Sequence, residues 1–272
     1  MDYICLLLLG TDFMQSDKLI TKVATIFACF TLVQLSACVN TLSAKKEQNY
    51  LVATGEITEN ADRFIGKSVL VRNDASQIVG TRNFILDKDR LFEGEPILVI
   101  NISGISLQFA NDKTPEMLVE GKVELLNIDS IEQQYSLNLD SNYHQYEGKP
   151  VIIATSVILS PDPEDITANP EIYYNKPLAI KGEVDDIEDY GIFEIDEEKA
   201  FGGEDLVVLQ PEFEIKLNEE QTIIAYGVVR QFIVEELERD YALCWNSAIK
   251  IEIEAKYGKK PVLVTDKIEI IR

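Results

Sequence analysis

The chain has 272 residues, with 47 acidic and 25 basic side chains and a formal net charge of −22 at pH 7. Residues 161–272 carry −15 of that charge, residues 50–160 carry −7, and residues 1–49 are neutral. Such a chain repels phosphate backbones and anionic lipid surfaces, so we expect no nucleic-acid partner; the acidic excess also favours solubility.

The N-terminal segment resembles a bacterial export signal. Lys18 and Lys22 supply a basic region, and residues 23–33 form an apolar run of the length usual in signal peptides. That run is short for a membrane span, which needs about 20 apolar residues. Because Asp2 and Asp12 fit such a signal badly, Met14 is a better translation start than Met1.

A lipid-attachment motif follows the apolar run. The four residues that carry it are Leu35, Ser36, Ala37 and Cys38. They resemble a lipobox, which implies cleavage before Cys38 and lipid on its sulfur. We therefore expect a signal segment over 1–37, a lipidated tether over 38–50, and an extracytoplasmic, membrane-anchored protein in the periplasm or an equivalent lumen. A plain N-terminal anchor, or a soluble secreted form with an incidental cysteine, remains the alternative.

Only one cysteine is left for other chemistry in the mature chain. Cleavage would remove Cys5 and Cys29, and lipid would occupy Cys38. Cys244 is then alone, so an intramolecular disulfide framework is excluded. Its apolar neighbours predict a buried, inert thiol.

The rest of the chain repeats itself at an offset of about 109 residues. Five blocks recur in the same order; they begin at residues 65, 84, 92, 119 and 146 and match residues 174, 193, 201, 225 and 257. A domain-sized repeat unit indicates a tandem pair, with repeat 1 over 51–160 and repeat 2 over 171–272. The proline-rich and acidic segment 161–170 predicts a stiff, exposed linker between them.

Apolar patterning predicts the same elements in both repeats. In repeat 1 the expected strands lie at 69–71, 84–86, 97–100, 118–123 and 151–154, with a helix at 128–139 before the last strand. In repeat 2 they lie at 178–184, 193–195, 206–209, 223–229 and 262–265, with a helix at 234–241. Asp129 or Ser130 is the expected cap of the first helix. The fold class is therefore mainly β, with one short helix per repeat.

The strand motifs resemble those of small OB-fold domains in exported bacterial proteins. The likeness is carried by residues 182–184, 191–196, 206–209 and 226–229, although each helix falls one strand later than usual. It implies two tandem OB-like, five-stranded, partly open β-barrels after the signal segment. The whole chain also resembles duplicated lipoproteins of cyanobacteria, a resemblance that brings no activity with it.

No constellation for catalysis emerges from the sequence. His144 is the single histidine, and we expect it to be an exposed polar residue. A Ser-His-Asp arrangement would have to use this histidine, because the chain has no other. One histidine and one mature thiol also cannot form a zinc site of the usual nitrogen and sulfur type. The prediction is a protein that is not an enzyme and needs no cofactor.

Carboxylates are the abundant polar groups of repeat 2. They are weak candidates for a cation site, because hard cations prefer loop oxygens. The candidates are Asp185, Asp186, Glu188, Asp189, Asp196 and Glu197. Their spacing does not match a calcium-binding loop, and a solvated acidic face is the simpler interpretation.

Two functions remain at this point. The first is a lipid-anchored, non-enzymatic binding or scaffolding protein with an unknown protein partner, contacting it through Phe64, Ile65, Tyr173 and Tyr174. The alternative is a cation or small-ligand sensor that uses the acidic loops of repeat 2.

Overall fold

The computed structural model describes residues 51–87, 94–105, 114–197, 203–212 and 215–271. The signal segment, the lipobox and Cys38 lie outside the described residues. Residues Gln48–Arg272 form one compact unit. Among the described helices, none has the length and apolar character needed to cross a membrane.

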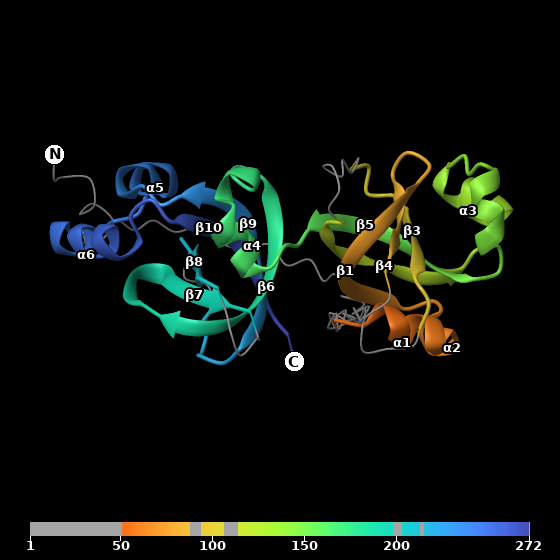
Figure 1. Ribbon diagram of the computed structural model, residues 1–272, viewed down its shortest axis with the longest axis horizontal. Coiled ribbons are helices and arrows are strands. Elements are labelled where there is room, and N and C mark those ends of the chain that lie inside the picture. The colour runs from red at the N-terminus through yellow and green to blue at the C-terminus, as the bar shows by residue number, and fades with distance from the viewer. Residues whose placement is uncertain (1–50, 88–93, 106–113, 198–202, 213–214, 272) are drawn as a thin grey trace, which may run out of the picture. The chain divides into compact units, whose positions relative to one another are not determined.

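The first five strands close into a β-barrel, which we call the first barrel (Figure 1). They are β1 (Ser68–Val79), β2 (Asn83–Leu86), β3 (Ile97–Asn101), β4 (Glu116–Leu125) and β5 (Pro150–Leu159). β1 pairs with β2 and β4, β2 with β3, and β5 with β4, all antiparallel. A parallel pairing of β3 with β5 completes the circuit. The expectation of a mainly β chain is confirmed.

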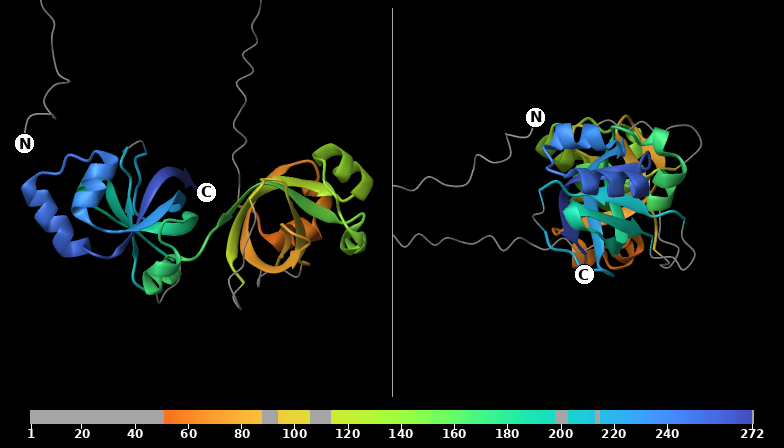
Figure 2. Two further views of the ribbon diagram at one scale, coloured as in Figure 1. Left: turned by 90° about the horizontal axis from the view of Figure 1, so that it is seen from above. Right: turned by 90° about the vertical axis from the view of Figure 1, so that its left-hand side faces the viewer.

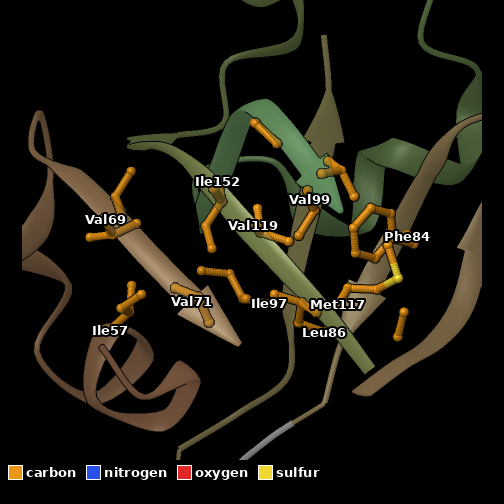
Figure 3. Close-up of a cluster of buried hydrophobic side chains, with 14 residues drawn as sticks. Ile57, Val69, Val71, Phe84, Leu86, Ile97, Val99, Met117, Val119 and Ile152 are labelled. Atoms are coloured by element: carbon orange, nitrogen blue, oxygen red, sulfur yellow. The ribbon is translucent and has the colours of Figure 1, made fainter. Parts of the chain in front are cut away.

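The core of the first barrel follows from the strand patterns (Figure 3). β1 turns Val69 and Val71 inward, and β3 is buried along its whole length: Ile97–Ile100 are apolar, and the buried Asn101 amide donates a hydrogen bond to the Ile105 carbonyl at 2.9 Å. Phe84 and Leu86 of β2 and Met117 of β4 fill the same interior. Burial of this apolar surface is the main stabilising contribution to the barrel.

The next five strands close in the same way and form the second barrel. They are β6 (Pro177–Ile187), β7 (Ile192–Asp196), β8 (Leu206–Leu209), β9 (Thr222–Gln231) and β10 (Pro261–Ile270). β6 pairs with β7 and β9, β7 with β8, and β9 with β10, all antiparallel, while β8 pairs parallel with β10. Proline begins the last strand of each barrel, because the first position of a strand tolerates the missing N–H.

A glycine in the fourth strand of each barrel permits close strand contact. At Gly121 and Gly227 an added Cβ would lie 2.5 Å from the Ile153 carbonyl oxygen and 2.2 Å from the Val264 carbonyl oxygen. A register shift in the same strand pair accompanies each close approach. These sites therefore require glycine because β-bulges bring backbone to backbone there.

The prediction of one short helix per barrel is wrong. The described helices are α1 (Thr54–Glu59), α2 (Ala61–Phe64), α3 (Ile128–Tyr135), α4 (Pro163–Ala168), α5 (Val234–Tyr241) and α6 (Ser247–Tyr257). Short 3-10 turns are η1 (Ser141–Tyr146), η2 (Pro170–Ile172) and η3 (Asp189–Gly191). α3 and α5 are the two expected helices. Figure 2 shows α5 and α6, in blue, beside each other on the second barrel.

The ends of α3 differ from the prediction. Its cap is Asn127, whose side chain accepts a hydrogen bond from the Ser130 backbone N–H, and not Asp129 or Ser130. The helix stops at Tyr135, because Ser136 adopts a left-handed conformation with φ 54°. The apolar face predicted for it does pack on the barrel.

The segment predicted as an exposed linker is partly buried. Residues 163–168 form α4, with a proline at its first position. Ile166 is fully buried in the core of the second barrel, and Pro161 and Pro163 are buried too. Proline and acidic residues suggested exposure, but one isoleucine between them binds the helix to the barrel core.

Candidate functional site

A hollow of about 730 Å³ lies on the outer face of the first barrel. Ile85 and Leu98, both buried, contribute its apolar part, and Ser76 and Gln77 of β1 border it. Three carboxylates and the Tyr146 ring also line the hollow. The carboxylates are Glu59, Asp87 and Glu95.

One wall of this hollow is held in place by α1. Gly94 packs so closely on Gly55 that an added Cβ would lie 2.4 Å from the Gly55 Cα. The Thr58 hydroxyl accepts a hydrogen bond from the Glu95 N–H at 2.9 Å and donates one to the Gly55 carbonyl at 3.2 Å. The backbone next to Glu95 is therefore fixed by contacts that leave its side chain exposed.

The charges of the hollow are not neutralised within the described residues. None of the three carboxylates forms an ion pair with another described side chain, while Lys149 lies over the Tyr146 ring, 5.9 Å from its centroid. The hollow therefore combines three carboxylates with one ammonium group, which lies over the aromatic ring, and with the side chains of two buried apolar residues.

The second barrel has a matching surface. Tyr257 and Lys260 precede Pro261 as Tyr146 and Lys149 precede Pro150. In both barrels the lysine N–H donates a hydrogen bond to the tyrosine carbonyl at 2.9 Å. The two turns are therefore equivalent in sequence and in geometry.

Side chains of the second barrel occupy its version of the surface. The Lys256 ammonium lies 3.1 Å from an Asp186 carboxylate oxygen and 3.2 Å from one of Glu194, and it also donates to Glu188. It sits 5.0 Å from the centroid of the Tyr257 ring. The hydrogen bond with Glu188 contributes most to a raised pKa of Lys256, so the ammonium stays charged.

Tyrosine and carboxylate groups beside this lysine are also perturbed. The Tyr257 hydroxyl donates to Glu194 at 2.9 Å, and burial raises the pKa of Tyr257 to about 12. Lys260 pairs with Glu204. Burial, followed by the charges of Glu194, Asp185 and Asp196, raises the pKa of Asp205. This face of the second barrel is a mixed-charge cluster and not an open pocket.

The five cation-site candidates whose side chains the structure describes do not converge on one point. Asp186 and Glu188 bind Lys256, whereas Asp185 and Asp196 act on Asp205. Glu197 is close enough to Glu116 to raise its pKa, and the side chain of Asp189 lies outside the described residues. Within the described part of the chain, no three histidine, cysteine or acidic side chains are grouped as metal ligands.

Other predicted residues are placed as follows. His144 is exposed on η1, as predicted. Cys244 is exposed, so the prediction of a buried thiol is wrong. It lies in a link between α5 and α6 where the flanking Leu243 and Trp245 pack inward, and the thiol between them points outward.

The four proposed contact residues are not freely exposed. Phe64 and Ile65 are half-buried and pack against the core of the first barrel. Tyr173 and Tyr174 do the same in the second barrel. Their position before the first strand of each barrel places them on its core, so the prediction that they are exposed contacts is wrong.

Sequence reasoning missed a polar cluster around Arg72. This guanidinium donates to Glu116 and to Asp162, each at 2.7 Å, and to the Ser160 hydroxyl and carbonyl oxygens, each at 2.9 Å. Burial outweighs the attraction of Arg72 and raises the pKa of Glu116 to about 7. Nothing in local spacing joins residues 72, 116 and 160, because the strand pairing alone brings them together.

Comparisons with known proteins provide little further guidance. No protein-family model matches the chain, and no curated protein matches it. One similar solved chain belongs to a structure described as "OBody AM3L09 bound to hen egg-white lysozyme". It shares 15% sequence identity, covers 37% of this chain and 86% of its own, and has a TM-score of 0.23. We draw no argument from so weak a likeness.

Proposed function

We propose that this chain is a lipid-anchored, extracytoplasmic binding protein without catalytic activity, built from two OB-like barrels that arose by duplication. The observation that carries the proposal is Cys38 at the end of a lipobox-like motif, in register with a basic region and an apolar run. Two or more acyl chains on that cysteine hold a protein firmly at a membrane surface.

The order of strand pairing supports the OB-like and duplicated parts of the proposal. Each barrel pairs its strands in the order first, second, third, fifth, fourth and back to first, with a parallel contact between third and fifth. That order is the one expected of an OB-fold. Together with the sequence repeat at about 109 residues, it favours a common origin of the barrels.

A binding role is favoured by the difference between the barrels. The first barrel has an open hollow where the second barrel has an internal cluster of charges. Concave, partly apolar sites with a few polar groups are typical of ligand binding. The cation-sensor alternative has less support, because two of its carboxylates, Asp186 and Glu188, already bind the Lys256 ammonium.

The anchor is tested by lipid labelling in bacteria. Full-length wild type and Cys38→Ser are expressed with radioactive palmitate, and membranes are separated from soluble material. We expect label and membrane association in wild type alone. A wild-type chain without label would contradict the anchor.

Two further measurements test the remaining parts. A reproducible hydrolase activity of the purified protein, lost on changing one carboxylate, would contradict the non-enzymatic role. For the sensor, a ligand that binds the folded state must stabilise it. A rise in melting temperature with millimolar Ca²⁺ would favour the sensor over the binding protein.

A further inference from the structure

The outer faces of the two barrels meet in an apolar cluster. It contains Leu70 of β1 and Leu118 of β4 from the first barrel, and Ala179 of β6 and Ile224 of β9 from the second. The residues on either side of each point into the barrel cores, so strand alternation turns these four outward. All four are buried, and burial of this apolar surface stabilises the joined state of the barrels.

Polar contacts beside this cluster hold the connection between the barrels. The buried Ser160 hydroxyl donates to the Ala179 carbonyl at 2.5 Å. From the first barrel, the Arg72 guanidinium donates to both oxygens of Ser160 and to the carboxylate of Asp162, which precedes α4. Because Ile166 of α4 fills the core of the second barrel, Arg72 ties the first barrel to a segment packed on the second.

Glu116 brings an ionisable group into this junction. Its carboxylate binds the same Arg72 nitrogen as Asp162, each at 2.7 Å. The described charged groups that face Glu116 are Arg72 and Asp74 from β1, Asp162 from the segment before α4, and Glu197 after β7. Among these described groups only Arg72 is a cation, so an ionised Glu116 meets repulsion from the connecting segment and from the second barrel.

Burial and charge make the ionised form of Glu116 costly in the joined state. Burial is the largest cause of a pKa raised from 4.5 to about 7, and the three neighbouring carboxylates add to it. Together they outweigh the attraction of the Arg72 guanidinium. The protonated acid is therefore the form that the joined barrels favour.

We propose that the junction between the two barrels is a pH-sensitive hinge, joined when Glu116 is protonated and open more often when Glu116 is ionised. Opening moves Glu197 away and brings water to the Glu116 carboxylate, which returns its pKa toward the ordinary value. The joined state is therefore stabilised fully below about pH 4.5, and this stabilisation is lost as pH rises through 7. Opening also uncovers Leu118 and Ile224, so pH controls access to an apolar surface that the joined state buries.

Single-molecule fluorescence energy transfer tests the hinge with the full-length chain in detergent micelles. One dye is attached to Cys244 on the second barrel and the other to Gln133→Cys on α3 of the first; both positions are exposed. Cys5→Ser, Cys29→Ser and Cys38→Ser remove the other thiols. Between pH 5 and pH 8, at constant ionic strength, we expect the ratio of open to joined molecules to rise about tenfold or more.

Glu116→Gln removes the titrating group and keeps a neutral side chain of nearly the same shape. We expect its ratio of open to joined molecules to change less than about twofold between the two pH values. The matched control, Glu252→Gln, removes an exposed carboxylate of α6 and should keep the wild-type response. An open population that does not rise with pH in wild type, or that rises equally in Glu116→Gln, would overturn the proposal.

Two further results separate opening from unfolding. The far-ultraviolet circular dichroism of wild type should be the same at pH 5 and pH 8, because the barrels stay folded as they part. Ile224→Ala weakens the apolar contact, so it should raise the open population at both pH values. A loss of β-sheet signal in step with energy transfer, or an unchanged open population in Ile224→Ala, would overturn the hinge. The test is independent of the lipid anchor, because these chains lack Cys38.

Discussion

Gly148 and Lys259 occupy the same backbone position in the two barrels. Their φ angles are 73° and 72°, and each N–H donates to the carbonyl of the residue after the fourth strand, Leu126 at 2.8 Å and Phe232 at 3.0 Å. Glycine adopts this left-handed conformation without a steric cost, whereas lysine does not. The second barrel therefore carries backbone strain that the first avoids.

Relief of that strain should stabilise the protein. We expect Lys259→Gly to raise the free energy of unfolding by roughly 0.5–1 kcal/mol, because the left-handed cost exceeds the added chain entropy of glycine. Urea denaturation followed by circular dichroism measures the change. The control is Lys176→Gly, the same replacement at an exposed residue without a positive φ, which should destabilise. A loss of stability in Lys259→Gly would contradict the strain argument.

Gly227→Ala tests the close strand contact in the second barrel. The added methyl group would lie 2.2 Å from the Val264 carbonyl oxygen, so β9 and β10 would have to separate. We expect a loss of about 3 kcal/mol or more, at the upper end for overpacking. The comparison is Gly104→Ala, where φ is 81° and no atom lies within 4 Å of the new methyl group. There backbone strain alone should cost about 1–2 kcal/mol; similar losses in both variants would argue against the contact.

Glu116→Gln should change how stability depends on pH. The folded state raises the pKa of Glu116 from 4.5 to about 7, mainly through burial, so folding favours the protonated acid. Its contribution is complete below about pH 4.5 and is lost as pH rises through 7. Glutamine resembles the neutral acid and does not ionise, so the variant keeps this contribution to stability as pH rises. The variant should therefore gain roughly 1–3 kcal/mol relative to wild type between pH 5 and pH 8.

Urea denaturation at both pH values and constant ionic strength measures this difference. Glu171→Gln, which removes an exposed carboxylate, is the charge-matched control. A difference between Glu116→Gln and wild type that is equal at pH 5 and pH 8 would show that burial does not disfavour the charged acid.

Tyr143→Phe tests a buried polar contact between η1 and the strands β1 and β2 of the first barrel. The Tyr143 hydroxyl donates to the Val79 carbonyl at 2.9 Å and accepts from the Asn83 amide at 2.6 Å. Removing it takes a hydrogen-bond partner from two buried polar groups, so we expect a loss of roughly 1–3 kcal/mol in thermal or urea unfolding. Tyr135→Phe, at a half-buried tyrosine of α3 that packs against the same cluster, is the control and should cost less. Equal losses would show that the Tyr143 hydroxyl has no special role.

Local pattern predicted the barrel strands because each has a clear apolar signature. β8 is a continuous apolar run and β7 alternates around Phe193 and Ile195, so both were found within a few residues. α6 was missed because Ile249, Ile251 and Ile253 recur at a period of two, which is typical of a strand. A usable signal was Asn246, whose side chain caps the helix by accepting from two backbone N–H groups.

The candidate site was predictable only in part. Sequence reasoning found the acidic residues of repeat 2 and treated Asp186 and Glu188 as a solvated acidic face or weak cation ligands. It missed their ion pairs with Lys256, because a lysine 68 or 70 positions away gives no local signal. It missed the hollow of the first barrel for the same reason. Glu59, Glu95 and Tyr146 belong to three separate segments that only the closed barrel brings together.

The sequence by itself determined the mainly β class and the order of the barrel strands, because these depend on periodicities within a few residues. It also carries the recurring blocks from which we propose a duplication, and the residues around Cys38 that resemble a lipobox. Only the tertiary structure decided that Arg72 binds Glu116 and Asp162 and that Ile166 packs segment 161–170 onto the barrel core. It also decided that Lys256 covers one face of the second barrel, while the corresponding face of the first barrel is an open hollow. Those contacts join residues far apart in the chain, and strand pairing creates them.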